Sequence, residues 1–113
     1  MTTQAVKALI EEILSQTELN KIHWDNGVSN NSYSFDLKSR RITIKKYGKD
    51  NNDLHYLELV VLIEGDEYIL SQELKGSNDY TLLDNLYLKI KEMSATINKI
   101  VEDIHSELIG DIF

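Results

Sequence analysis

Residues 54–74 read LHYLELVVLIEGDEYILSQEL, and this stretch decides the fold. Its first ten residues, which end at Ile63, become apolar on both sides of an extended chain, a pattern typical of a central strand covered on two faces. Residues 64–67 (EGDE) predict a tight hairpin turn, and residues 68–74 predict the returning strand. The connection is far too short for a parallel crossover, so the two strands are predicted to pair antiparallel.

The chain before this hairpin extends the sheet, because its apolar residues recur with period two. They alternate with polar residues over 33–37 and again over 42–44, and Ile22 and Trp24 share one face of an earlier extended segment. Polar, turn-rich stretches at 26–31 and 48–53 separate these runs. The pattern predicts an antiparallel meander of four or five strands, with Trp24 in the core.

An amphipathic helix is predicted at residues 3–16, before the sheet. Its apolar residues follow the spacing of one helical face. Thr2 or Thr3 can cap its first turn, and Asn20 is a plausible stop. The apolar positions are Val6, Leu9, Ile10, Ile13 and Leu14.

A second helix is predicted from Tyr80 to about Ile109, capped by the polar residues 75–79 and ended by Gly110. Thirty helical residues extend about 45 Å, whereas a compact domain of this size is roughly 35 Å across. Either this helix breaks near Ser94–Thr96 and wraps the sheet, or its end projects and needs a partner. Homodimerisation through the C-terminal half is one hypothesis for that partner. Its heptad-like stripe comprises Leu83, Leu86, Ile90, Met93, Ile97, Ile100 and Ile104.

The fold class predicted from these segments is α+β, in one domain over residues 1–113. An N-terminal helix, an antiparallel meander sheet and a long C-terminal helix packed on the sheet follow one another. Both helices are expected to cover Leu57, Leu59, Val61 and Ile63. The apolar fraction of 42% and the absence of cysteine fit a globular protein without disulfides. The sequence has no signal pattern and no apolar run of membrane-spanning length. We therefore expect a cytoplasmic protein that does not associate with a membrane.

No sequence motif for catalysis, metal binding or phosphate binding is present. His23, His55 and His105 lack metal-ligand spacing, and residues 50–53 lack the glycine and glutamate of an EF-hand loop. We therefore expect a protein that is not an enzyme and has no metal or cofactor. Lysine outnumbers arginine ten to two, a bias that suggests an AT-rich coding sequence of bacterial or phage origin.

Charge is unevenly distributed along the chain, whose net charge is −7. One segment is a candidate basic patch, and it suggests either protection of a sheet edge or a surface for an acidic partner. The remainder carries six basic and nineteen acidic side chains, which makes nucleic acid an unlikely ligand because phosphates are repelled. The patch comprises Lys38, Arg40, Arg41, Lys45, Lys46 and Lys49.

Acidic residues also gather near the end of the second helix, where the helix dipole disfavours them. We take this as a hint of binding, and the candidate partner-binding residues are Glu102, Asp103, Glu107 and Phe113. The order of elements and the acidic pI of 4.8 resemble the dimeric secretion chaperones that hold effector proteins. That resemblance covers only the order of elements, lacks their mid-sheet helix and carries over no residues.

The function hypothesis favoured by these features is a stoichiometric protein-binding module, such as an adaptor, chaperone, immunity protein or phage-encoded inhibitor. It would act through the acidic surface and the C-terminal helix. One alternative is a small-ligand-binding domain with a pocket between sheet and helix. A less favoured alternative is a nucleic-acid binder that uses residues 38–49.

Overall fold

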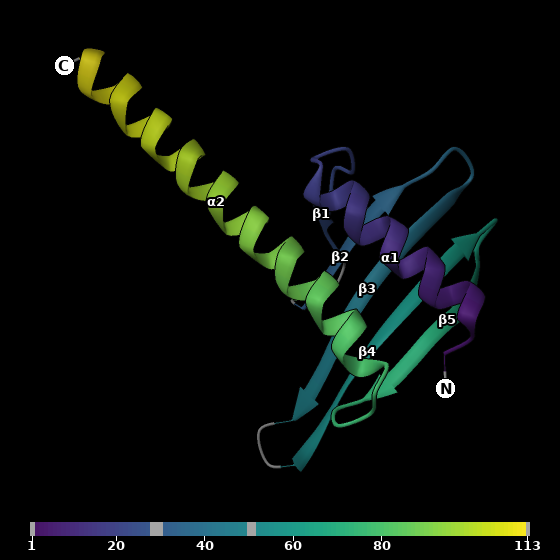
Figure 1. Ribbon diagram of the computed structural model, residues 1–113. Helices are drawn as coiled ribbons and strands as arrows, with labels where there is room; N and C mark the ends of the chain where they lie inside the picture. Colours follow the sequence, from purple (N-terminus) through teal and green to yellow (C-terminus); the bar gives the residue numbers. More distant parts are fainter. Residues whose placement is uncertain (1, 28–30, 50–51, 113) are drawn as a thin grey trace.

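The hairpin at residues 54–74 forms as predicted in a computed structural model that describes residues 2–27, 31–49 and 52–112 (Figure 1). Ile63 and Asp66 are paired across its turn, and Glu64 and Gly65 have positive φ angles of 51° and 88°. Two central residues with positive φ make a type I′ turn, whose twist suits a two-residue hairpin.

Five antiparallel strands form one sheet in the order β1-β2-β3-β4-β5, which confirms the α+β meander. Helices α1 and α2 flank the strands in sequence, and Figure 1 shows both of them in front of the sheet. The elements are α1 (Gln4–Glu18), β1 (Asp25–Asn26), β2 (Ser32–Asp36), β3 (Arg40–Lys49), β4 (Asn52–Ile63), β5 (Asp66–Leu74) and α2 (Tyr80–Ile112).

The two predicted turn regions are shorter than the sequence indicates. Gly48 and Lys49 belong to β3 and pair with His55 and Asn52 of β4, so the ladder extends into the polar stretch. Asn26 belongs to β1, whereas Ile22 and Trp24 precede this strand. Backbone hydrogen bonds allow polar side chains at the end of a ladder, and the side-chain pattern does not reveal them. Residues 28–30 and 50–51 of these turns lie outside the described residues.

A single apolar core lies between the sheet and the two helices. Leu57 and Leu59 of β4 are fully buried, Val61 is nearly so, and Ile63 packs against the cluster from its margin. These four positions therefore lie beneath the helices, as predicted. The buried cluster comprises Ile10, Ile13, Phe35, Ile42, Ile44, Leu57, Leu59, Val61, Tyr80, Leu83, Leu86, Tyr87 and Ile90.

The second face of β4 is not covered by a helix, contrary to the pattern of a strand covered on both sides. Val60 is 2% exposed on this face, but its neighbour Leu62 is 38% exposed. Ile69, which pairs with Val60 from β5, is 57% exposed. Val60 lies between Thr43 of β3 and Ile69 of β5 in the middle of the sheet, so we infer that its burial does not require a second helical layer.

Both predicted caps of α1 are present. Thr3 is the N-cap residue, and its hydroxyl oxygen accepts a hydrogen bond of 3.3 Å from the Val6 amide. At the other end, Asn20 adopts a φ of 63°, and the amide of Lys21 bonds the carbonyl of Gln16. A left-handed residue of this kind ends many helices, and asparagine tolerates it better than most residues.

A polar cluster fastens the N-terminal segment and α1 to the start of α2. The Lys7 ammonium lies 3.1 Å from the Asp79 carboxylate, and the Thr2 amide donates a hydrogen bond of 3.2 Å to the same carboxylate. The Thr2 hydroxyl donates to the Glu73 carboxylate at 2.6 Å, and the Ser77 hydroxyl donates to it at 3.0 Å. These contacts hold α1 and α2 side by side on the sheet.

Loss of the Asp79 carboxylate is expected to weaken the fold in a pH-dependent way. The bond with Lys7, helped by the Thr2 amide, lowers the pKa of Asp79 from its ordinary value of 3.8. A lowered pKa in the folded state contributes stability above the ordinary value, and that stability disappears as the pH falls through the lowered pKa. Asp79→Asn should therefore lower the melting temperature at about pH 7, and its difference from wild type should shrink as the pH falls below 3.8 through the lowered pKa of Asp79.

Thermal melts of both proteins across this pH range, with Asp66→Asn as the matched control, would check the expectation. Asp66 is an exposed acid at the β4–β5 turn. A destabilisation by Asp79→Asn that stays the same at every pH would show that the paired charge does not contribute.

Helix α2 is continuous over 33 residues and runs past the body of the protein. Figure 1 shows its C-terminal half extending clear of the sheet and of α1. The radius of gyration is accordingly 16.4 Å, above the ~13 Å of a compact chain of this length. Of the two predicted alternatives, the structure has the projecting helix and not the break near Ser94–Thr96.

The predicted helix end at Gly110 is wrong, because α2 continues to Ile112. Among the described glycines only Gly65 and Gly76 have positive φ, so Gly110 does not form the left-handed cap that favours glycine there. The hydroxyl of Thr96 bonds the carbonyl of Glu92 at 3.0 Å, which satisfies this polar residue inside the helix.

In the described part of the chain, no helix has both the length and the apolar content needed to cross a membrane.

Candidate functional site

A row of aliphatic side chains lies uncovered along the projecting half of α2, and we call it the apolar stripe. Its members are between 50% and 59% exposed, and every residue from 95 to 110 is exposed. The same row is fully buried nearer the start of the helix, where Leu83 and Leu86 pack on the sheet. The apolar stripe comprises Ile97, Ile100, Val101, Ile104 and Leu108.

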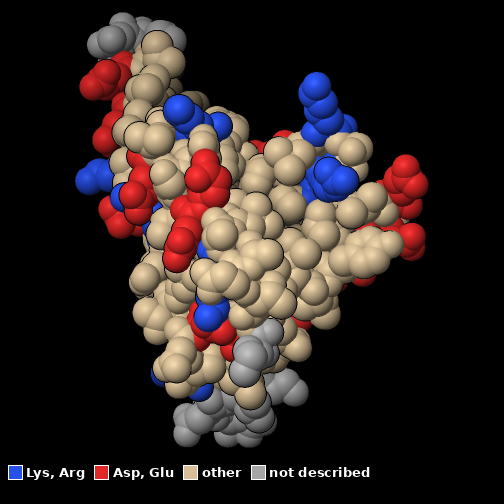
Figure 2. Space-filling view, turned by 45° about the vertical axis from the view of Figure 1, so that its right-hand side comes forward, with Lys and Arg blue, Asp and Glu red and all other residues tan. Residues whose placement is uncertain are grey.

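Acidic residues border one side of the apolar stripe. Asp103 and Glu107 each follow a stripe residue by three positions, which places them beside Ile100 and Ile104 on the helix surface. Glu102 lies two positions from both isoleucines and therefore points to the far side of α2. Figure 2 shows acidic side chains along the projecting helix at the upper left.

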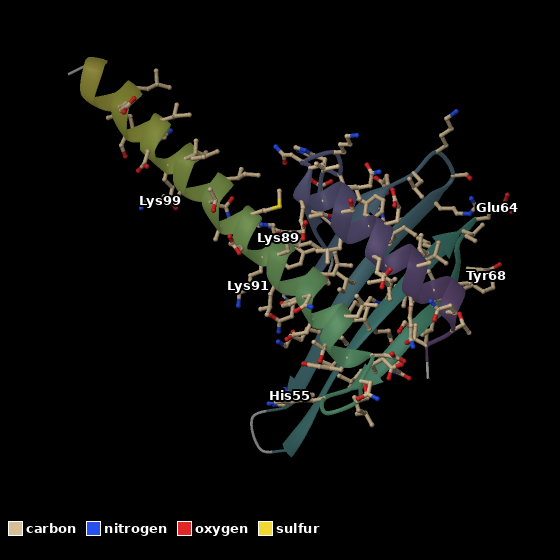
Figure 3. All side chains as sticks on the ribbon, viewed as in Figure 1. His55, Glu64, Tyr68, Lys89, Lys91 and Lys99 are labelled. Atoms are coloured by element: carbon tan, nitrogen blue, oxygen red, sulfur yellow. The ribbon has the colours of Figure 1, made fainter. Side chains whose placement is uncertain are left out.

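Two of the four predicted partner-binding residues thus flank the exposed apolar surface. The structure separates Glu102 from them, and Phe113 lies outside the described residues. Asn98 and His105 occupy the other flank of the stripe, beside Val101. Figure 3 shows Lys91 and Lys99 pointing to one side of α2, away from α1. Lys99 is two positions from Ile97 and so does not border the stripe, but it lies four positions before Asp103 and therefore next to that acid on the helix surface.

A pocket of about 390 Å³ lies where α2 leaves the body. Its apolar lining joins Ile22 and Trp24 to Ile90, Met93 and Ile97, the last of which begins the apolar stripe. The sequence could not reveal this pocket, because it depends on how residues 20–26 pass beside α2. The stripe therefore reaches the pocket at Ile97, but the pocket itself has a mixed lining. Its polar lining residues are Asn20, His23, Asp25, Asn26, Ser94 and Asn98.

The Trp24 side chain is held in a fixed orientation at this pocket. Its indole nitrogen donates a hydrogen bond of 3.0 Å to the Thr17 hydroxyl of α1. Its ring also meets Phe35 edge to face, with 4.6 Å between the ring centroids. Trp24 thus packs against the core, as predicted, while one part of it lines the pocket.

The structure does not gather the candidate basic patch into one surface. Arg41 and Lys45 point to the uncovered face of the sheet and Lys46 points to the helix face, because successive residues of a strand alternate. Lys38 lies in the connection between β2 and β3, Arg40 begins β3, and the Lys49 side chain is outside the described part. Figure 2 shows Lys and Arg side chains scattered over the face it draws.

Three of these cations are paired with acids. The Arg41 Nε atom lies 2.7 Å from Asp36 Oδ1. The Nζ atoms of Lys45 and Lys46 lie 3.6 Å from Glu67 Oε1 and from Asp84 Oδ1, respectively. The hydrogen bond from Arg41 also lowers the pKa of Asp36. These ion pairs reduce the positive charge that the segment presents to an anion.

The described residues hold no group of three or more histidine, aspartate or glutamate side chains that could bind a metal ion. His55 packs against Gly48 at one end of the sheet, whereas His105 lies on the projecting helix. Comparison of the chain with protein families, with curated proteins and with solved structures finds no match. Its function must therefore be argued from this geometry.

Proposed function

We propose that this protein is a non-enzymatic, stoichiometric protein-binding module whose partner docks along the apolar stripe of α2. The exposure of that stripe carries the proposal. Five aliphatic side chains line one side of a helix, and no other part of the described chain covers them. A contiguous, exposed apolar row with a polar border is a feature of protein-interaction surfaces.

The pocket beside Trp24 also supports this proposal. Small-ligand binding at that pocket is the alternative function, but the pocket opens at the start of the stripe and shares Ile97 with it. A docking segment that follows the stripe would reach this pocket and could place a side chain in it. Nucleic-acid binding is less favoured, since Arg41, Lys45 and Lys46 are paired with acids.

Polar replacement of the stripe tests the proposal. The double variant Ile100→Ser/Ile104→Ser should keep the wild-type melting temperature within about 2–4 °C, because exposed positions contribute little to stability. It should nevertheless lose partner affinity at least about tenfold, because each isoleucine is expected to become buried in the complex. The control Ile69→Ser/Leu74→Ser alters two side chains of similar exposure on β5.

Tagged wild type and both double variants would be used to capture proteins from the source organism, followed by mass spectrometry. We expect wild type and the β5 control to recover one protein at near-equal stoichiometry, and the stripe variant to lose it. Recovery of the same protein by all three baits would rule out the stripe as the docking site. Recovery of the bait alone would count against the whole proposal.

A further inference from the structure

The position of the sheet restricts how any second helix can cover the apolar stripe. The stripe continues the row of α2 that includes Leu83 and Leu86, so it faces the same side as the sheet. If a second copy of α2 lay parallel to the first, its own sheet would enter the space that the first sheet occupies. Two copies could pair only in an antiparallel arrangement, with their bodies at opposite ends.

Charge opposes that antiparallel pair. The two-fold axis of an antiparallel pair is perpendicular to both helices. Each flank of one stripe therefore faces the same flank of the stripe on the other copy. The overlap must be centred near Ile104, because the body limits it at Ile97 and the helix ends at Ile112. Asp103 and Glu107 of both copies would then lie together, and like charges across an interface reduce affinity. Lys99 lies four positions before Asp103, and therefore beside it, and offsets part of this charge, but no lysine or arginine of α2 lies three or four positions from Glu107.

From this arrangement we infer that the partner on the apolar stripe is an amphipathic helix of a different protein, with lysine or arginine beside its apolar face. The inference rests on the proposed function and names the class of its partner. The apolar residues of such a helix, spaced by three and four positions, would cover the stripe. Its cations would lie along the flank of Asp103 and Glu107, where opposite charges favour association.

The pocket beside Trp24 provides an anchor at the body end of this helix. A typical stable interface buries about 800 Å² on each partner, and a single row of five half-exposed aliphatic side chains is a small part of that. A large apolar side chain placed among Ile22, Trp24 and Met93 would extend the contact from the stripe into the body. Large side chains seated in such pockets often dominate binding energy.

Two synthetic helical peptides that differ only in charge can test the partner class. Both contain the same leucine row and no tryptophan; one has lysine and the other glutamate at every flanking position. Since Trp24 is the only tryptophan of the chain, its fluorescence reports occupancy of the pocket. We expect the lysine peptide to bind the full chain at least about tenfold more tightly than the glutamate peptide, and this advantage to shrink as salt rises.

Matched charge variants identify the flank that carries the effect. Asp103→Asn/Glu107→Gln should weaken binding of the lysine peptide about three- to tenfold. Glu64→Gln/Asp66→Asn removes the same charge at the β4–β5 turn, and Figure 3 shows Glu64 far from the projecting helix. This control should bind as wild type does. Equal losses in both variants would overturn the inference, because net charge alone would explain them.

Other outcomes separate this inference from the proposed function. Equal binding of both peptides, or binding of neither, overturns the basic-helix partner, whereas the capture experiment still decides whether the stripe docks a protein. Sedimentation of the full chain as a dimer that Ile100→Ser/Ile104→Ser dissociates would identify a second copy as the occupant and also overturn the inference. A monomer that binds only the lysine peptide supports it.

Discussion

A protein carrying Leu59→Asp is expected to lose its cooperative thermal unfolding transition. Leu59 is 0% exposed, lies between Ile44 and Ser71 in the sheet and belongs to the core beneath both helices. Removing a buried leucine side chain costs about 2–5 kcal/mol. An unpaired buried carboxylate adds a desolvation cost of several kcal/mol. The total approaches the roughly 5–15 kcal/mol that stabilises a whole domain.

Calorimetry and circular dichroism would detect this loss, and Ile69→Asp provides the control. Ile69 lies one strand away on the uncovered face and is 57% exposed, so its replacement should shift the melting temperature by no more than about 4 °C. If Leu59→Asp melted as wild type does, the assignment of this side of β4 to the core would be wrong.

The elements that the sequence predicts well are those with local causes. The turn at Glu64 and Gly65 needs two residues with positive φ, and the alternation over 33–37 reflects which side of one strand is buried. The ends of β3 and β4 are different, because their pairing depends on a partner strand and not on apolar side chains. Gly110 shows the same limit, since a helix-ending residue ends a helix only when its backbone turns.

The candidate site depends more strongly on tertiary structure. Spacing predicts the row from Leu83 to Ile104, and helix length predicts that one end could project. Only the extent of the sheet decides which residues of that row become buried and which stay exposed. The basic segment shows why a run of like charges in sequence does not predict a patch on the surface. Its neighbouring residues alternate between two faces of the sheet and pair with distant acids such as Glu67 and Asp84.

The projecting half of α2 has no described tertiary contact that explains its helical state, but the first half provides a nucleus. Starting a helix is unfavourable, whereas adding residues to an existing helix is close to neutral or favourable. Tyr87 and Ile90 are fixed against the body, so the residues beyond them extend a helix that has already formed. The dipole slightly opposes this extension at Glu102 and Glu107. We infer that the exposed helix adds little to the stability of the domain and is available for a partner.

A chain that ends at Lys99 is therefore expected to keep its fold and lose its partner. Its melting temperature should lie within about 4 °C of the full chain, because residues 100–110 are exposed and outside the core. Ile97 and the Trp24 pocket remain, but four of the five stripe residues are gone. Binding of both the captured protein and the lysine peptide should fall below detection.

Thermal melts, the Trp24 fluorescence titration and the capture experiment would be run on the full chain and on this shortened chain together. A large drop in melting temperature would show that the distal helix stabilises the body, for example by folding back or by pairing between copies. Unchanged melting with unchanged binding would move the docking site to the body, where the pocket beside Trp24 and the uncovered face of the sheet are the remaining candidate surfaces. Unchanged melting with lost binding is the result that separates the two halves of α2, one for folding and one for recognition.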